Sequence, residues 1–324
     1  MKKIFCLVII AFLSTLAYGV DYNSIDEYSR SVPKMPNYGQ MSLKLTSPFK
    51  NDEDKVRSIF VWIAENIRYD VAKFNAQFKN GGYTRIYGKN HKEIELKKEK
   101  LKQDKINTTY NSEKGVCEDY CYLFQAMCQV SGIKCEFITG YGRQFPNALI
   151  RKTNSMMHAW NAVFINNEWK LVDVTWAAGI TDIKTGKFRK KFQNAFFFTE
   201  PEIFILNHYP NENKWQLLER KISTDTYNNF PFVYDGYYDY SLKNIPKNKF
   251  LKSSQPFNIL TFKFSGNIPA LAVFENGNLL KTDKIVNKDE VTFKIPTSNK
   301  HNRQIIIGVL NGKIFDPIAE YLIN

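Results

Sequence analysis

The stretch GVCEDYCYLF, residues 115–124, sets a cysteine two positions behind a glycine and opens an apolar pattern at helical spacing. This pattern predicts a helix over residues 116–130, and Ser131-Gly132 supplies the stop. Because Gly115 allows a sharp turn, the thiol of Cys117 falls in the first turn of that helix. Unpaired backbone N–H groups and the helix dipole stabilise a thiolate there, so Cys117 is a candidate nucleophile.

The neighbouring cysteines fit a zinc site poorly. Zinc ligands come as a close pair with a second pair or with histidines, whereas Cys117, Cys121 and Cys128 lie along one helix face and cannot surround an ion. Cys117 and Cys121 stand one turn apart with near-parallel side chains, which is poor geometry for a disulfide. Cys128 and Cys135 either form a disulfide or are two buried thiols, and the spacing suits both. We therefore expect no metal and no cofactor.

Residues 157–179, MHAWNAVFINNEWKLVDVTWAAG, predict two strands joined by a tight turn. Asn166-Asn167 tolerates the left-handed angles that a two-residue turn needs, and the strands are expected over residues 158–165 and 168–176. With this turn length, the residues that flank the turn pair with each other. A loop longer by one residue would move every side chain of the second strand to the opposite face.

This register makes His158 and Asp173 diagonal neighbours on one sheet face, close enough for an imidazole and a carboxylate to meet. The carboxylate orients the ring, fixes its tautomer and favours the imidazolium form. Next to Cys117, the pair completes a set of nucleophile, base and orienting acid. His91 lies in a charged segment, and His208 has no carboxylate at comparable spacing, so we expect His208 to be structural.

With these residues in place, the sequence resembles the transglutaminase-like superfamily, the circularly rearranged relatives of papain. The resemblance rests on three blocks, which are Ile67-Arg68-Tyr69-Asp70 at the end of a helix, GVCEDYCYLF, and HAWNAVFINNEWKLVDVTW. The tail FFFTEPEIFILNHYPNENKWQLL also resembles that of exported bacterial members related to the kyphoscoliosis peptidase. The resemblance covers about residues 52–218.

Carried over residue by residue, the resemblance implies Cys117 as the nucleophile, His158 as general base and then acid, and Asp173 as the orienting carboxylate. It also implies that the backbone N–H of Cys117 contributes to an oxyanion hole. The sequence does not assign the second donor of that hole. Tyr83 and Trp62 are candidates, although such residues more often serve packing.

The resemblance implies an enzyme that cleaves or transfers at amide bonds through a cysteine thioester, on a protein, peptide or peptidoglycan-type substrate. Transglutaminases proper often carry a tryptophan directly after the nucleophile, where this chain has Glu118. We therefore expect a peptidase or amidase rather than a cross-linking enzyme. The alternative is a non-catalytic cell-envelope protein that uses the same fold for binding or scaffolding.

The chain is expected to divide into three parts. Residues 1–19 join two lysines to a short apolar run and small residues, as in a cleaved secretory signal, so we expect a secreted or periplasmic protein with no later membrane span. Residues 20–226 are expected to form an α+β transglutaminase-like domain with N-terminal helices, a central antiparallel sheet and a lysine-rich insertion near residues 82–114. Residues 227–324 lose the helical period and predict a small all-β sandwich.

Periodic segments outside the motifs predict further elements. Residues 51–70 carry apolar positions at helical spacing, with Asn51 or Asp52 placed to cap the start. The C-terminal part alternates over short segments, and Asn276-Gly277 and Asn311-Gly312 supply hairpin turns. The expected C-terminal strands cover residues 259–264, 270–274, 291–295, 304–309 and 313–322.

The charge of the chain indicates a solvated surface more than a nucleic-acid partner. The formal net charge is +13 over 324 residues. The lysines stand among acids, as in residues 91–105, HKEIELKKEKLKQDK, which predict a solvated helix. The sequence carries no nucleic-acid motif and no stripe that interleaves basic and aromatic residues. We therefore expect no nucleic-acid partner, and the amide substrate is what the family resemblance implies.

Overall fold

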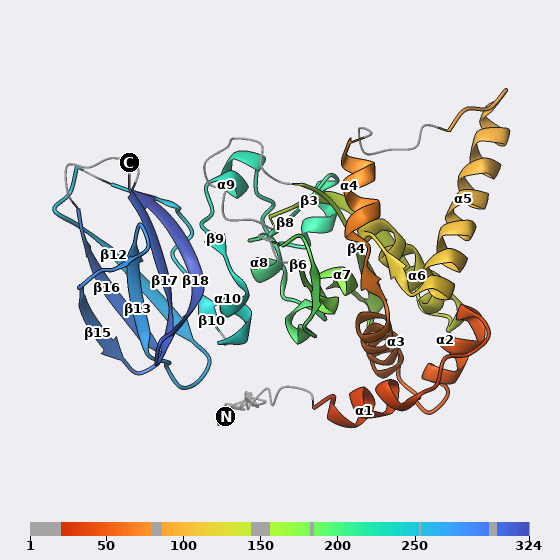
Figure 1. Ribbon diagram of the computed structural model, residues 1–324, viewed down its shortest axis with the longest axis horizontal. Helices are drawn as coiled ribbons and strands as arrows, with labels where there is room; N and C mark the ends of the chain where they lie inside the picture. Colours follow the sequence, from red (N-terminus) through yellow and green to blue (C-terminus); the bar gives the residue numbers. More distant parts are fainter. Residues whose placement is uncertain are drawn as a thin grey trace, which may run out of the picture.

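The computed structural model describes residues 21–79, 86–143, 156–181, 185–240, 242–252, 254–297 and 303–323. Figure 1 shows helices at one end of the molecule, a small sheet in the middle and a β-sandwich at the other end. This combination of helices with mainly antiparallel sheets confirms the α+β class. The predicted signal, residues 1–19, lies outside the described residues. None of the described helices combines the length and the apolar character that a membrane crossing requires.

The helical end is built around α3 (Asp52–Asn66) and α6 (Cys117–Val130), both of which the periodicity predicts. The Asn51 side chain accepts a hydrogen bond from the Asp54 N–H at 2.8 Å, which confirms the predicted cap of α3. The other helices of this end are α1 (Asn23–Ser31), α2 (Tyr38–Thr46), α4 (Val71–Lys79) and α5 (His91–Ser112).

The lysine-rich segment forms helix α5, which projects from the helical end in Figure 1. Its first half is solvated, as predicted, whereas Ile106 and Tyr110 in its second half are buried. Lys105 Nζ lies 2.5 Å from Glu118 Oε2 and so joins this helix to α6. The segment is therefore partly built into the core beside the nucleophile helix.

The central sheet is antiparallel, with the strand order β5-β4-β3-β8. Ile165 pairs with Glu168, which confirms the predicted register of the hairpin. Asn166 and Asn167 both have positive φ angles, 50° and 66°, as a two-residue turn of this kind requires. The strands are β3 (Cys135–Gly142), β4 (Met156–Ile165), β5 (Glu168–Val172) and β8 (His208–Pro210).

The second strand of the hairpin is shorter than predicted. The strand ends at Val172, and α7 (Val174–Ala178) replaces the strand expected to residue 176. The reason is Asp173, whose Oδ1 accepts hydrogen bonds from the N–H groups of Thr175 and Trp176 at 2.9 and 3.0 Å. An aspartate that caps a helix satisfies donors which a strand would offer to its neighbour, and the alternation of apolar residues does not reveal this choice.

The C-terminal part is a sandwich of two sheets, as predicted. One sheet has the order β10-β12-β16-β15, and the other has the order β11-β18-β17-β13-β14 with β9 beside β18. Strand β15 is not predicted by the alternation, because all of its residues are exposed at the sheet edge. The strands are β9 (Phe232–Val233), β10 (Leu242–Asn244), β11 (Phe250–Leu251), β12 (Phe257–Phe264), β13 (Leu271–Glu275), β14 (Asn278–Leu279), β15 (Asp283–Asn287), β16 (Glu290–Pro296), β17 (Arg303–Asn311) and β18 (Ile314–Ile323).

Of the two hairpin turns predicted for the sandwich, one forms at the predicted residues and the other is shifted. Asn276-Gly277 links β13 to β14 with both residues at positive φ, as predicted. The other turn lies one residue later than predicted, because Asn311 still pairs with Ile314 and Gly312 takes the positive φ of 61°. The short connecting elements are β6 (Gly179–Thr181), β7 (Phe188–Lys190), η2 (Asn194–Phe196), α8 (Pro201–Phe204), η3 (Asn213–Gln216), α9 (Thr224–Asn228) and α10 (Asp235–Asp239).

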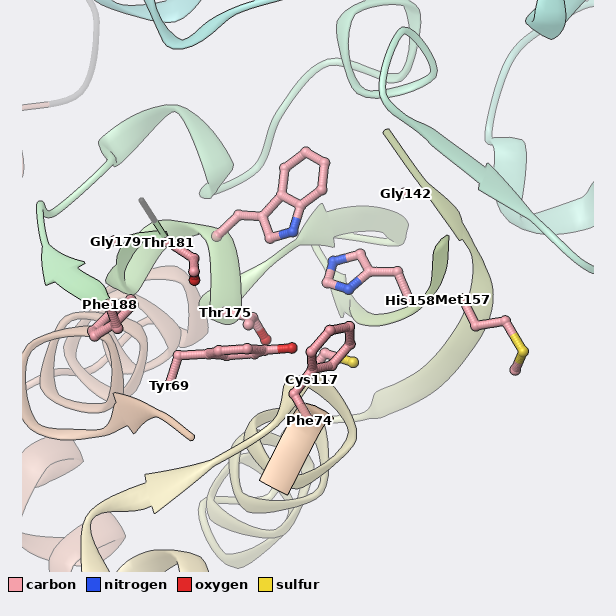
Figure 2. A pocket seen from close by; sticks show the side chains of 11 residues that line it. Tyr69, Phe74, Cys117, Gly142, Met157, His158, Thr175, Gly179, Thr181 and Phe188 are labelled. Atoms are coloured by element: carbon pink, nitrogen blue, oxygen red, sulfur yellow. The ribbon is translucent and has the colours of Figure 1, made fainter. Parts of the chain in front are cut away.

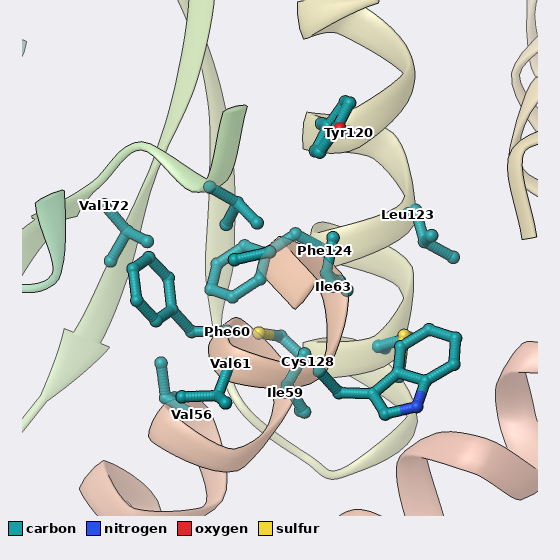
Figure 3. Close-up of a cluster of buried hydrophobic side chains, with 14 of the residues drawn as sticks. Val56, Ile59, Phe60, Val61, Ile63, Tyr120, Leu123, Phe124, Cys128 and Val172 are labelled. Carbon is teal, nitrogen blue, oxygen red and sulfur yellow. The ribbon is translucent and has the colours of Figure 1, made fainter. Parts of the chain in front are cut away.

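Two large apolar cores hold these layers together. Figure 3 shows the first, in which Phe60 and Ile63 from α3 meet Phe124 and Cys128 from α6. The second core fills the sandwich. It also takes in side chains that precede residue 227, where the sequence analysis places the domain boundary, so that boundary stays a prediction. Those side chains are Ile205, Leu206, Tyr209 and Leu218.

Candidate active site

Cys117 is the first residue of α6, as predicted. The parallel strands β1 (Arg68–Tyr69) and β2 (Lys114–Gly115) bring the chain before α6 alongside the end of α3. Gly115 does not have the left-handed backbone that a sharp turn suggested. A Cβ at this position would lie 2.7 Å from the Cβ of Asp119, so the glycine is explained by close approach to the helix.

Asp119 fixes the start of α6, where Cys117 lies. Its side chain is fully buried, and Oδ2 accepts hydrogen bonds from the Val116 N–H at 2.8 Å and from Lys73 Nζ at 2.6 Å. A carboxylate in the first turn that reaches back to the cap residue fixes the start of a helix. Asp119 lies three residues after Val116, but valine has no side-chain acceptor for the usual reciprocal motif, so the sequence gives only half of this signal.

His158 and Asp173 meet at one side of this helix start. His158 lies on β4, and its Nε2–H donates a hydrogen bond to Asp173 Oδ2 at 2.7 Å. The hairpin register predicts two strand residues on one face, whereas Asp173 is the N-cap of α7. Nε2 is occupied by this bond, so Nδ1 is the ring nitrogen left to face Cys117. The Trp176 ring stacks on the imidazole with 5.1 Å between centroids.

The charges of the pair are set by burial and by each other. Burial alone would lower the pKa of His158, but the Asp173 carboxylate and a hydrogen bond with Cys117 raise that pKa to about 10. Burial opposes ionisation of Asp173, yet hydrogen bonds and charge from His158 and His208 hold the pKa of Asp173 well below its usual range. At neutral pH the pair is therefore an imidazolium and a carboxylate.

His208, which was expected to be structural because no carboxylate stands at comparable spacing in the sequence, has a carboxylate partner in the fold. Its Nε2–H donates a hydrogen bond to Asp173 Oδ2 at 2.9 Å, on the oxygen that also binds His158. Spacing along the sequence does not reveal this contact, because strand β8 enters the sheet on the far side of β3. The motif HYP itself carries no signal that would have placed this ring beside Asp173.

A pocket opens in front of two of the three predicted site residues, Cys117 and His158, whereas the third, Asp173, is buried and does not line it. Figure 2 shows the Cys117 sulfur and the Tyr69 hydroxyl pointing into the same space below the His158 ring. The pocket wall is largely apolar or aromatic. Its lining residues are Tyr69, Phe74, Cys117, Gly142, Met157, His158, Thr175, Trp176, Gly179, Thr181 and Phe188.

Other candidates of the sequence analysis lie away from this pocket or outside the description. Trp62 is buried and stacks on Tyr110 with 5.6 Å between ring centroids, so it cannot reach a substrate. Tyr83 lies outside the described residues. Cys128 and Cys135 are both buried free thiols, which selects the second of the two alternatives left open by their spacing.

His158, Asp173 and His208 also meet the loose spacing of a metal site, since their ligand atoms lie within 4.8 Å of one another. Both imidazoles, however, are at hydrogen-bond distance from one carboxylate oxygen, and the other oxygen accepts two backbone N–H groups. The arrangement therefore fits a hydrogen-bonded network. A metal would have to displace these bonds.

Comparison with known proteins supports the family resemblance that was seen in the sequence. Residues 79–174 match the family model described as the transglutaminase-like superfamily. The chain is 26% identical over 309 residues to the kyphoscoliosis peptidase of Mus musculus, covering 94% of this chain and 43% of that protein. It is 24% identical over 237 residues to hillarin of Drosophila melanogaster, covering 69% of this chain and 26% of that protein. The family resemblance seen in the sequence is thus confirmed.

The chain spans less than half of the length of these curated relatives. A solved structure of a candidate cysteine protease from Cytophaga hutchinsonii aligns with 48% of this chain and 43% of its own, at 20% identity and a TM-score of 0.28. A TM-score this low does not establish a shared overall arrangement.

Proposed function

Because this chain carries a transglutaminase-like domain, we propose that it is a cysteine enzyme that cleaves amide bonds through a thioester on Cys117. The observation that supports this most is the order of contacts from thiol to imidazole to carboxylate. Cys117 and His158 line the same pocket, where Cys117 contributes to the raised pKa of His158, and His158 Nε2 lies 2.7 Å from Asp173 Oδ2. This is the arrangement of nucleophile, base and orienting acid that covalent catalysis requires.

The proposed reaction begins from an ion pair in which the proton of the Cys117 thiol has already passed to Nδ1 of His158, so that His158 is an imidazolium. The thiolate attacks the substrate carbonyl carbon, and a C–S bond forms as the carbonyl oxygen takes the negative charge. The imidazolium then gives its proton to the leaving amine, and the C–N bond breaks to leave a thioester. Water, deprotonated by the same imidazole, attacks the thioester, and the C–S bond breaks. This releases the carboxylic acid and restores the Cys117 thiolate beside the His158 imidazolium.

Two donors are positioned for the oxyanion of that intermediate. The N–H of Cys117 lies in the first turn of α6, where backbone donors have no partner within the helix. Tyr69 supplies the second donor in this proposal, because its hydroxyl points into the pocket beside Cys117 (Figure 2). Burial and then the neighbouring Cys117 raise the pKa of Tyr69 well above its usual value, so the hydroxyl keeps its proton.

The surroundings of the site support hydrolysis of a peptide-like substrate more than cross-linking. Glu118, which stands where transglutaminases proper often have tryptophan, is paired with Lys105 of α5 at 2.5 Å and does not line the pocket. Tyr69, Phe74 and Phe188 give the pocket an apolar wall. We therefore assign a protein, peptide or peptidoglycan-type amide as substrate, with an apolar side chain next to the scissile bond.

The test is turnover by the Cys117→Ala variant on a library of peptides and peptidoglycan fragments, with products read by mass spectrometry. The wild type is expected to release amine products, and Cys117→Ala is expected to release none. Cys121→Ala is the matched control, because it removes a buried thiol one turn further along the same helix. Turnover by Cys117→Ala equal to that of the wild type would contradict the proposal.

The non-catalytic binding protein is the other outcome of the same experiment. It predicts that neither the wild type nor Cys117→Ala releases products from any fragment. It also predicts that Cys117 of the wild type reacts with iodoacetamide no faster at pH 6 to 7 than free cysteine does.

A further inference from the structure

We propose that His208 is a positioning residue of this site, which holds the Asp173 carboxylate in the place from which it orients His158. This inference depends on the proposed function, because it assigns a role within the same catalytic site. The observation that motivates it is a single oxygen, Asp173 Oδ2, which accepts a hydrogen bond from His158 at 2.7 Å and from His208 at 2.9 Å.

The sheet brings the two histidines to Asp173 from opposite sides of one strand. In the order β5-β4-β3-β8, His158 lies on β4 opposite Gly140 of β3, and His208 lies on β8 opposite Gly142 of β3. Directly opposed residues share a face, and positions 140 and 142 of one strand also share a face. Both rings therefore project from the same side of the sheet towards the start of α7.

The intervening strand is shaped to leave room for them. A Cβ at Gly142 would lie 3.1 Å from His158 Cβ and 3.1 Å from a ring carbon of Trp176. At Gly140 it would lie 2.3 Å from the backbone oxygen of Tyr209 on β8 and 2.5 Å from the Trp160 ring. A side chain at Gly140 or Gly142 would therefore displace neighbouring rings or backbone at this site. The two glycines are accounted for by this close packing.

The His208 ring is fixed on its other sides by aromatic residues. Phe204 stacks on it at 3.9 Å with 20° between the planes, and the Trp176 and Trp160 rings lie 4.3 and 5.2 Å away. His208 is completely buried. A ring packed in this way cannot change rotamer, so its Nε2–H is a rigid donor to Asp173.

The carboxylate is consequently held by four donors. Oδ1 accepts the N–H groups of Thr175 and Trp176, and Oδ2 accepts the two imidazoles. The backbone bonds alone leave the plane of the carboxylate free to tilt, whereas the bond from His208 fixes Oδ2 on the side of His158. A carboxylate that cannot turn holds His158 in one orientation and one tautomer.

The second imidazole also leaves the charge of Asp173 available to His158. Burial lowers the pKa of His208 to about 4, with Asp173 opposing the shift and the charge of His158 adding to it. His208 is therefore neutral at the pH at which the enzyme works. It donates a hydrogen bond to Asp173 but adds no positive charge that would compete with the His158 imidazolium for the carboxylate. The charged groups that act on it are Asp173 from the cap of α7 and His158 from β4.

The test compares two variants that differ by one methylene. In His208→Gln the amide nitrogen reaches the position of Nε2 and can still donate to Asp173, whereas the amide of His208→Asn is too short. The readout is the rate of Cys117 alkylation by iodoacetamide between pH 5 and 9, followed by peptide mapping, with thermal unfolding measured in parallel. The wild type serves as the reference.

We expect His208→Asn to lose on the order of 10- to 100-fold in alkylation rate near pH 6 to 7, since a displaced orienting group can cost about 100-fold. His208→Gln is expected to stay within a few-fold of the wild type. Equal losses in both variants would indicate a merely structural ring and overturn the inference. An unchanged pH profile in His208→Asn would overturn it as well.

Two further measurements keep the inference separate from the proposed function. A wild-type Cys117 that labels no faster than free cysteine at pH 6 to 7 contradicts the proposed function. Nitrogen-15 NMR of the wild type reads the tautomer of His208 directly and needs no variant to fold. The inference requires a proton on Nε2 at pH 7, and a spectrum with the proton on Nδ1 alone would overturn it.

Discussion

The sandwich and the surroundings of the pocket differ in what they bury. In the described part of the sandwich, strands such as β16 alternate buried apolar residues with exposed ones, and Phe293 and Ile295 point inward. Next to the pocket, Asp173 is fully buried and accepts four hydrogen bonds. The sandwich also buries charged groups, such as Arg303 and Glu320, but none of its described carboxylates is held by as many donors as Asp173. Burying a charge costs free energy that apolar packing does not, so this concentration of donors indicates a role for Asp173 beyond stability.

The difference indicates where each kind of substitution should act. Changes in the sandwich core should lower the free energy of unfolding and leave the chemistry of the folded protein intact. Changes around Asp173 should remove activity out of proportion to any loss of stability, because shifted pKa values and fixed hydrogen bonds gather at that site.

The largest expected effect is that of Asp173→Asn. The neutral amide neither stabilises the imidazolium nor fixes its tautomer, so kcat/KM should fall by about three to four orders of magnitude. Steady-state kinetics on a cleaved peptide measure the loss. Asp239→Asn is the control, because Asp239 is an exposed partner of Lys191 and should leave the rate unchanged. A loss below about tenfold in Asp173→Asn would place the orienting role elsewhere.

The sandwich should show its largest response to Phe262→Ala. The Phe262 side chain is completely buried among Phe293 and Tyr321, and truncation of a buried phenylalanine costs about 3–5 kcal/mol. Guanidinium unfolding measures the free energy of unfolding. Alkylation of Cys117 in the remaining folded protein should keep the wild-type rate. A slower rate there would mean that the sandwich core and the pocket are coupled.

Tyr69→Phe removes the proposed second oxyanion donor and keeps the ring. The loss in kcat should be about 100- to 1000-fold, with little change in KM, because the bond forms only as the oxyanion develops. The free energy of unfolding should change little, since the ring still packs near Phe74 and Phe188. An unchanged kcat would exclude Tyr69 from the oxyanion hole.

The two histidines should give the folded protein opposite responses to pH. The folded pKa of His158 is raised from 6.5 to about 10, so its contribution to stability is present below about pH 6.5 and is lost as pH rises towards 10. The folded pKa of His208 is lowered from 6.5 to about 4, so the unfolded chain binds the extra proton and stability falls as pH drops from 6.5 to 4. Each proton changes stability by about 1.4 kcal/mol per pH unit.

Unfolding of the wild type and of His208→Gln at pH 5 and 6.5 isolates the acid side of this prediction. The variant should lose less stability on acidification than the wild type does. His158→Gln should likewise lose less between pH 6.5 and 9. If His208→Gln kept the acid dependence of the wild type, His208 would not be the group that takes up the extra proton on unfolding. That result would contradict the lowered pKa of His208.

The smallest effect is expected on the outer face of the sandwich. Ile285 on the edge strand β15 is 68% exposed, so Ile285→Thr should change the free energy of unfolding by no more than about 0.5 kcal/mol. Kinetics and Cys117 labelling should match the wild type. A stability loss comparable with that of Phe262→Ala would show that this face is covered and would remove the contrast between core and surface.

Local sequence patterns determined much of this structure. The 3.6-residue period placed α6 with Cys117 at its start, and Asn166-Asn167 fixed the register that carries His158. Alternation located the main strands of the sandwich. These features depend on residues a few positions apart, whose backbone preferences and faces can be read along the chain. The family motif added the roles proposed for Cys117, His158 and Asp173.

Only the tertiary structure decided which distant groups meet. His208 contacts Asp173 across 35 positions, and Lys73 contacts Asp119 across 46. Asp173 itself became a helix cap, because donors at the next two residues compete with the strand ladder that the alternation favoured. A period assigns a residue to a face of its own element, but the packing of separate elements determines what that face contacts, and no local preference encodes that packing.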